Sequence, residues 1–163
     1  MILETNRCTI KPVGIEDKTD LHRLCDDPNV WQYLGGQATA EHNRKNIDYI
    51  GKVPITDRWV VRGKADDSFL GAISLIPHHA GDDLEVSYLF LSKHWGKGYA
   101  SEVVTAVIHY AFSEKKINRL LAETQSANLA SCRMLEKLGF HKIKNLVRFE
   151  AEQALYAIDN PAG

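Results

Sequence analysis

Several features that mark other protein classes are missing from this sequence of 163 residues. No apolar run approaches the roughly 18 residues of a membrane-spanning helix. The first residues contain no basic stretch followed by a long apolar run, so we expect no signal peptide. The 20 basic and 21 acidic residues leave a net charge of −1, without the basic excess that is typical of nucleic-acid-binding proteins. These absences predict a cytoplasmic protein with no membrane and no nucleic acid as partner.

Cysteine is scarce, and Cys8, Cys25 and Cys132 are far apart. An odd number at such spacings forms neither a disulfide framework nor a Cys-x-x-Cys metal pair. We expect each thiol to be a small buried hydrophobic group in a reducing compartment. His78 and His79 are adjacent, but no third ligand is spaced to join them, which favours a polar loop and no metal site.

The residues that are present have the composition of an ordinary globular protein. Hydrophobic residues make up 44% and charged residues 25%, and this length suits one domain over residues 1–163. Alternating apolar and polar residues predict strands, whereas apolar spacings of three and four predict helices. Strands are expected at Cys8–Pro12, Arg58–Arg62, Phe69–Ile76, Leu84–Leu91, Leu120–Thr124, Phe140–Ile143 and Arg148–Ile158, and helices at Glu16–Cys25, Thr39–Ile50, Ala100–Glu114 and Leu129–Leu138.

The order of these segments predicts the fold class. The helix at 100–114 joins the strands at 84–91 and 120–124, and such a crossover makes the two strands parallel. The strands between 58 and 91 have short connections, which favour an antiparallel meander. We therefore expect an α/β chain with a single mixed, mostly antiparallel sheet of six to seven strands, flanked by about four helices.

A glycine-rich loop carries the clearest chemical signal. Gly96 and Gly98 lie between a strand and the following helix. Two glycines at this spacing permit tight turns in which successive N–H groups point toward one spot. The first N–H groups of a helix are unpaired and its dipole is positive there, which favours binding of a phosphate or pyrophosphate. Lys93 and Lys97 add positive charge, although a glycine-rich turn without function would have the same residues.

Two motifs resemble those of a known enzyme family. Trp95–Ala100 has the sequence WGKGYA and is similar to the cofactor motif of the GNAT N-acetyltransferases, Arg/Gln-x-x-Gly-x-Gly/Ala, with Trp95 in the Arg/Gln position. Asn128–Ser131, followed by Glu136–Phe140, resembles the second motif of the family, in which an Asn and a short helix precede Lys-x-Gly-Phe.

Two further segments, Leu3–Pro12 and Glu85–Tyr88, resemble one branch of this family, the RimJ/RimL-like ribosomal-protein N-terminal acetyltransferases. The whole resemblance extends over about residues 3–158. It implies that the strands at 84–91 and 120–124 splay apart into a V that holds acetyl-CoA. It also implies direct transfer of the acetyl group to a primary amine, which in this branch is a protein N-terminal α-amine.

The resemblance also assigns residues to the cofactor. The pantetheine arm would add edge-on to a strand, the pyrophosphate would take backbone N–H groups of the loop and helix, and an N–H near Leu89 would bind the acetyl carbonyl. The implied contacts are Leu89, Phe90 and Leu91 on the strand, Trp95, Gly96, Lys97, Gly98, Tyr99, Ala100 and Ser101 in the loop and helix, and Asn128 and Ser131 beyond them.

Glu85 is the implied general base, because it lies on the strand that lines the family's active site; a solvated carboxylate is the alternative. Many members of the family have a tyrosine that acts as the general acid four residues after the position of Ser131, where this sequence has Leu135. Ser131 is the implied substitute, with a capping or cofactor-contacting role as the alternative. Tyr88 is a third candidate, although strand alternation places it among core residues.

The family lines its acceptor pocket near Trp31 and Tyr33, and Tyr88 is also expected there, with core packing as the alternative. The motifs do not name the acceptor, since the same frame serves small amines such as polyamines, amino acids and antibiotics. A non-catalytic acyl-CoA sensor and a module that binds nucleotide phosphates are also compatible with the sequence. The apolar strand Ala154–Ile158 would be covered within a monomer or would pair with a second copy in a homodimer.

Charge is divided unevenly along the chain. Residues 93–148 contain ten basic and four acidic residues, a surplus of six, and the other residues have ten basic and seventeen acidic ones, a deficit of seven. This division favours an anionic cofactor at the basic part and a cationic amine at the acidic part.

Overall fold

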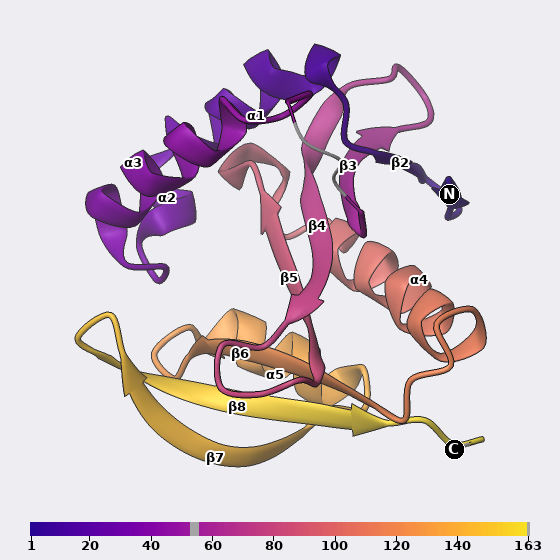
Figure 1. Ribbon diagram of the computed structural model, residues 1–163, viewed down its shortest axis with the longest axis vertical. Coiled ribbons are helices and arrows are strands. Elements are labelled where there is room, and N and C mark those ends of the chain that lie inside the picture. The colour runs from indigo at the N-terminus through magenta and orange to yellow at the C-terminus, as the bar shows by residue number, and fades with distance from the viewer. Residues whose placement is uncertain (53–55, 163) are drawn as a thin grey trace.

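A computed structural model describes residues 1–52 and 56–162 (Figure 1). Within these residues, eight strands form one sheet in the order β1-β2-β3-β4-β5-β6-β8-β7. The strands are β1 Leu3–Glu4, β2 Cys8–Pro12, β3 Arg58–Gly63, β4 Phe69–Pro77, β5 Leu84–Phe90, β6 Arg119–Gln125, β7 His141–Arg148 and β8 Ala151–Asp159. The helices are α1 Lys18–Cys25, α2 Pro28–Trp31, α3 Gly36–Ile47, α4 Tyr99–Ser113 and α5 Leu129–Lys137, with short 3-10 turns at Ile15–Asp17 and Ser92–His94.

The sheet is mixed because β5 and β6 are parallel, as the crossover through α4 predicts. Their pairing joins Leu84 to Leu120 and Glu85 to Leu121, and there it ends, although both strands continue. Figure 1 shows the two strands running apart beyond this point. This divergence, called the V below, is the splay that the family resemblance implies.

The two faces of β5 support two separate cores. Val86, Tyr88 and Phe90 point toward α4 and α5, where they pack with the buried apolar face of α4. Leu89 and Leu91 point the other way, toward the cluster formed by α1, α2 and α3. The V is therefore open to two different layers of helices.

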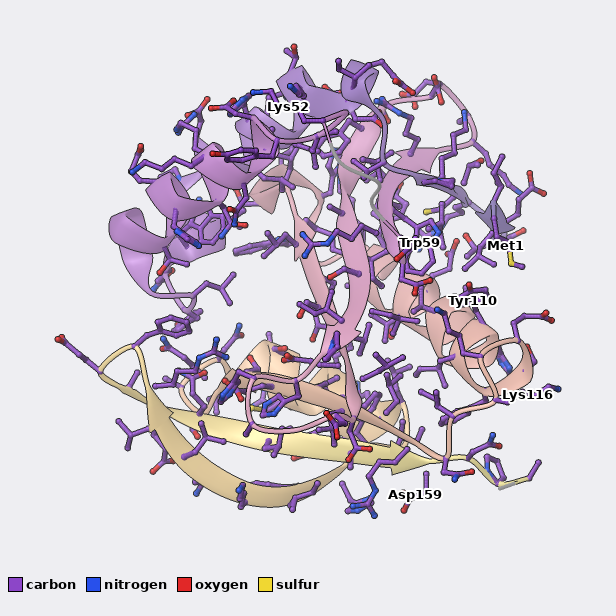
Figure 2. The ribbon with its side chains drawn as sticks, viewed as in Figure 1. Met1, Lys52, Trp59, Tyr110, Lys116 and Asp159 are labelled. Atoms are coloured by element: carbon purple, nitrogen blue, oxygen red, sulfur yellow. The ribbon has the colours of Figure 1, made fainter. Side chains whose placement is uncertain are left out.

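Aromatic packing fixes α4 against the far end of the sheet. Trp59 of β3 and Tyr110 of α4 meet edge to face, with ring centroids 5.6 Å apart (Figure 2). The same helix buries Val103, Val104 and Val107, which the spacings of three and four predict. This packing holds the first turn of α4 in place beside the end of β5.

Several boundaries differ from those predicted. The helix α3 begins at Gly36 and ends at Ile47 rather than spanning Thr39–Ile50, and β7 begins at His141 rather than Phe140. The final predicted strand, Arg148–Ile158, is interrupted by the turn Phe149–Glu150. The sequence pattern predicts neither β1 nor α2, because segments of two and four residues are too short to show periodicity.

The apolar strand β8 lies between β6 and β7, so it is covered within this chain and β7 occupies the edge. Cys8, Cys25 and Cys132 are buried free thiols, as expected. Among the helices of the described residues, none has the length and apolar character needed to cross a membrane.

Candidate active site

Backbone groups of β5 line the V. The N–H of Leu91 donates to the carbonyl of Leu70 over 3.0 Å, and β4 and β5 pair without a register shift. Because N–H directions alternate along an antiparallel strand, the N–H of Leu89 points toward β4, whereas those of Tyr88 and Phe90 point into the V. An N–H group near Leu89 is therefore available in the V at Tyr88 and at Phe90, but not at Leu89 itself.

The glycine loop adopts the backbone conformation that only glycine reaches without strain. Gly96 has a φ of +75° and Gly98 a φ of +80°. Gly98 caps α4, and the first hydrogen bond of the helix runs from the N–H of Glu102 to its carbonyl, over 3.1 Å. The N–H groups of Tyr99, Ala100 and Ser101 precede that bond, and the space beside Gly96 is open. The loop therefore fits an anion such as a pyrophosphate.

Trp95 differs from the expectation for this loop. Its backbone N–H donates to the Ser92 carbonyl over 3.1 Å, and its indole N–H donates to the Phe90 carbonyl over 2.9 Å. Both donors are thus used within the protein, so neither is available to a ligand. The indole bond instead fastens the loop to the end of β5.

The amino-terminal segment Leu3–Pro12 contacts the first turn of α4, which follows the glycine loop. The Glu102 carboxylate accepts hydrogen bonds from the Arg7 backbone N–H at 2.9 Å, from Arg7 Nε at 2.8 Å and from the Thr5 hydroxyl. The Arg7 guanidinium also lies 4.3 Å from the centre of the Tyr99 ring. Although burial opposes the shift, the bonds from Thr5 and Arg7 lower the pKa of Glu102. Residues before β2 therefore anchor the first turn of α4 beside the glycine loop.

Tyr88 and Ser131 meet on the face of the sheet that is covered by α4 and α5. Their hydroxyl oxygens are 2.8 Å apart, and burial raises the pKa of Tyr88 to about 12. Ser131 lies in the first turn of α5, where its N–H donates to the side chain of Asn128 over 3.3 Å. Leu135 is fully buried in the core, so the position of the missing tyrosine is structural here. The hydroxyl that meets Ser131 comes from Tyr88 on β5 instead.

Glu85 lies at the point where the V opens, on the opposite face from Tyr88. It is only 9% exposed. Burial, together with the negative charge of Glu123, raises its pKa to about 7, while Arg148 acts in the opposite direction. A carboxylate with this pKa can accept a proton near neutral pH.

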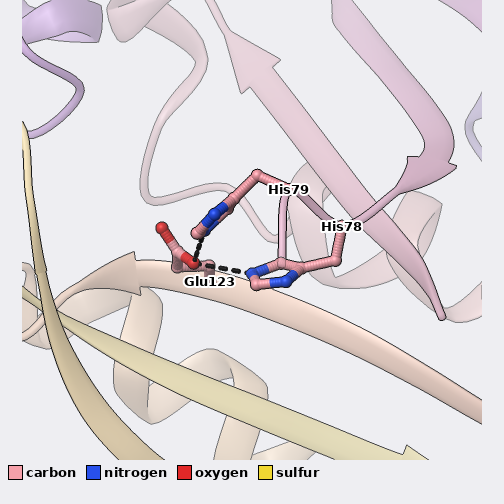
Figure 3. A group of neighbouring side chains, drawn as sticks. All are labelled: His78, His79 and Glu123. Carbon is pink, nitrogen blue, oxygen red and sulfur yellow. Dashed lines mark hydrogen bonds and ion pairs between the residues drawn. The ribbon is translucent and has the colours of Figure 1, made fainter. Parts of the chain in front are cut away.

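His78 and His79 lie in the loop between β4 and β5, as predicted, but the expectation that no third ligand joins them is wrong, because Glu123 lies beside both. Nε2 of His78 lies 2.8 Å and Nε2 of His79 2.9 Å from the same Glu123 oxygen (Figure 3). The Ala80 N–H donates to Nδ1 of His78 over 3.3 Å, so the proton of this imidazole is on Nε2, facing the carboxylate. Two imidazoles and a carboxylate match the donor set of a zinc site, and in this structure hydrogen bonds hold the three side chains together. We assign a hydrogen-bonded cluster.

Trp31 and Tyr88, which were both expected to line the acceptor pocket, lie on opposite sides of the sheet. Trp31 is buried, and its indole N–H donates to the Leu24 carbonyl over 2.8 Å, so it packs in the core. Tyr88 faces α5, on the other side of the sheet from α2. Tyr33 is half-buried in the turn after α2.

Phe149 is a residue of this region that the sequence did not indicate. It forms the β7–β8 turn with Glu150, at φ values of +55° and +60°, and its side chain is 49% exposed. A Cβ atom placed on Gly35 would lie 3.5 Å from the Phe149 ring. Figure 1 shows this hairpin tip approaching the turn between α2 and α3. The two turns together bound the α1–α3 side of the V.

A family model described as an acetyltransferase (GNAT) domain matches residues 7–141. The chain belongs to the GNAT acetyltransferases. Among curated relatives, the YkkB protein of Bacillus subtilis is 28% identical over 94% of this chain and 93% of that protein. The N-acetyltransferase YnaD of the same organism is 25% identical over 87% of this chain and 84% of that protein.

Solved structures show the same fold. A GNAT acetyltransferase from Bacillus anthracis superposes with a TM-score of 0.83 at 24% identity, covering 98% of this chain and 99% of that one. RimL, a ribosomal L7/L12 alpha-N-protein acetyltransferase solved with coenzyme A, gives 0.78 at 15% identity over 100% of both chains. A spermidine N-acetyltransferase chimera from Vibrio cholerae and hSSAT gives 0.76 at 15% identity, covering 95% and 96%. Such similar scores leave the branch within the family undecided.

This GNAT acetyltransferase is therefore an enzyme rather than a passive sensor, and GNAT acetyltransferases use acetyl-CoA. The replacement of the family's tyrosine by Leu135 favours a sensor when the sequence is considered alone. The hydroxyl of Tyr88 weakens that argument, because it comes from β5 and lies against Ser131 in the same helix that carries Leu135.

Proposed function

We propose that this enzyme transfers the acetyl group of acetyl-CoA to the α-amine of a protein or peptide. One observation carries the proposal: Glu85 faces α1–α3 at the V, while the hydrogen-bonded Tyr88 and Ser131 face α4 and α5. A proton acceptor and a hydroxyl pair thus stand on opposite faces of one opening. Such an arrangement suits a reaction whose two substrates enter from opposite sides.

The chain offers matching groups for acetyl-CoA. The N–H groups from Gly96 to Ser101 would hold the pyrophosphate, Lys97 adds charge, and the edge of β5 that faces the V at Tyr88 and Phe90 would hold the pantetheine arm. The N–H of Tyr88 or Phe90 would donate to the acetyl carbonyl, where negative charge develops. The amide of Asn128, already bonded to Ser131, would orient the arm near α5.

In the proposed reaction Glu85 takes one proton from the ammonium group, and the neutral amine nitrogen then attacks the thioester carbonyl, so that an N–C bond forms and the C–S bond breaks. The second proton that the nitrogen loses goes to the departing thiolate, which leaves as the thiol of coenzyme A. Tyr88, with a pKa of about 12, is too weak an acid to give its proton up to a thiolate of pKa about 8.5. Tyr88 therefore acts as a hydrogen-bond donor to the departing sulfur, with Ser131 orienting its hydroxyl.

The pKa of Glu85 favours an α-amine over a lysine or polyamine. An α-amine has a pKa of about 8, so its proton moves to a carboxylate of pKa about 7 at a cost of about 1 kcal/mol. For an amine with a pKa of about 10.4 the cost is about 5 kcal/mol. RimL, which shares the fold, is named an alpha-N-protein acetyltransferase, which supports the same choice.

The test is release of coenzyme A thiol in the presence of acetyl-CoA and a panel of amines. We expect turnover with peptides that have a free amino terminus, and none with the same peptides after N-terminal blocking. Turnover of spermidine or aminoglycosides in place of peptides would contradict the choice of acceptor. We place this reaction in the cytosol, because the three cysteines are free thiols.

A further inference from the structure

Five titratable side chains gather on the α1–α3 face beside the V. Glu85 pairs with Leu121, and Glu123 lies two residues beyond Leu121, so the two carboxylates share one face of the sheet. The connection from β4 to β5 adds His78 and His79, and β7 adds Arg148. Figure 3 shows both imidazoles converging on Glu123.

Glu123 is held as an anion by three donors. One of its oxygens lies 2.8 Å from His78 and 2.9 Å from His79, and the other lies 3.3 Å from Arg148. The side chains of Glu123 and His78 are only 5% and 3% exposed. Burial alone would raise the pKa of Glu123, but these hydrogen bonds outweigh burial and lower it.

Glu85 has the opposite surroundings, although it belongs to the same cluster. It is buried beside the negative charge of Glu123, and the backbone N–H of Glu123 donates to its carboxylate. Arg148 is the cation that faces it, whereas His78 and His79 bond to Glu123. Two neighbouring carboxylates in unequal surroundings separate into one that stays charged and one that can be protonated.

We propose that Glu123, kept anionic by His78, His79 and Arg148, is a positioning residue that makes Glu85 a proton acceptor at neutral pH. This inference deepens the proposed function and depends on it for its catalytic meaning. Glu123 and Arg148 shift the pKa of Glu85 in opposite directions. The anion of Glu123 favours protonation of Glu85, and the cation of Arg148 opposes it.

The test uses two substitutions with opposite expected effects. The titration of Glu85 is followed by carboxyl-carbon NMR of protein labelled at glutamate, and its signal is assigned by its loss in Glu85→Gln. In the unaltered protein the midpoint is expected near pH 7. Glu123→Gln should lower the midpoint by about one pH unit, and Arg148→Gln should raise it. Lys144→Gln, which removes an exposed cation from the same strand, should leave it unchanged.

Shifts in the same direction for both variants, or no shift in either, would overturn the inference. Arg148 is half-exposed, so Arg148→Gln keeps the test decisive if Glu123→Gln does not fold. A midpoint that changes when EDTA is added would also overturn it, since a bound metal ion would then be the controlling charge. The titration requires no acceptor, whereas failure of every amine in the thiol-release assay would reject the proposed function instead.

Discussion

The hydroxyl oxygen of Tyr88 lies 2.8 Å from that of Ser131 and joins β5 to the first turn of α5. This contact crosses the V on its α4–α5 side. It brings together two residues that the sequence analysis considered for catalysis, Ser131 as the substitute for the family's tyrosine and Tyr88 as a further candidate that was also expected near the acceptor. In the proposed reaction this hydroxyl pair donates to the departing sulfur of acetyl-CoA.

Tyr88→Phe should lower kcat roughly tenfold to hundredfold, because one donor to the developing charge is lost. The KM for acetyl-CoA should change little. Ser131→Ala should have a smaller effect, since Tyr88 keeps its hydroxyl but loses its orienting partner. Steady-state kinetics of thiol release measure both values. Tyr110→Phe, in the same fold but away from the V, is the control and should retain full activity.

Activity should depend on pH through Glu85. Protonated Glu85 cannot take a proton from the amine, so kcat/KM should fall as pH drops below about 7. Glu85→Gln should lose most activity together with this dependence on pH. A profile with the same acid limb in Glu85→Gln would assign the limb to another group.

Glu85 should also make stability depend on pH. Its pKa is raised in the folded state to about 7 from an unfolded value of 4.5. Its contribution to the free energy of unfolding is therefore fully present below pH 4.5. That contribution, about 3 kcal/mol, is lost as pH rises to 7. Urea unfolding at pH 5 and pH 8 should therefore show a smaller difference in Glu85→Gln than in the unaltered protein.

The glycine loop should tolerate no side chains when acetyl-CoA binds. Gly96→Ala and Gly98→Ala force alanine to positive φ, which costs about 1 kcal/mol of stability and displaces the N–H groups. Calorimetry should show at least tenfold weaker binding of acetyl-CoA. The matched control is Gly81→Ala, at an exposed glycine with open space and no positive φ, which should bind acetyl-CoA normally.

Phe149 should affect the acceptor and not acetyl-CoA. Phe149→Asn replaces the ring by a residue that tolerates its φ of +55°, so stability should stay the same or rise. The KM for the peptide should rise severalfold, because the ring borders the acceptor side of the V. Val147→Ala, on an exposed side chain of β7, should alter neither value. A rise in the KM for acetyl-CoA alone would contradict this placement.

Contiguous residues are enough to predict α4, the glycine loop that precedes it and the parallel pair β5–β6. The helix depends on its apolar repeat and the loop on the freedom of Gly96 and Gly98, which are both local, and the pair depends on the handedness of one crossover between consecutive strands. Strand alternation, which is equally local, places Glu85 and Leu89 on one face of β5 and Tyr88 on the other.

Long-range packing decided the rest of the site. Glu123 comes from a strand more than forty residues beyond His78 and His79, and no spacing rule connects them. Only the register of the sheet brings its carboxylate to their imidazoles and to Glu85. Likewise, Trp31 is a core residue because its ring is buried among the helices α1–α3. Phe149 borders the V because the β7–β8 turn approaches the turn between α2 and α3. The sequence by itself determined the family motifs and their local geometry, and tertiary structure decided which charges meet, since charges interact through space rather than along the chain.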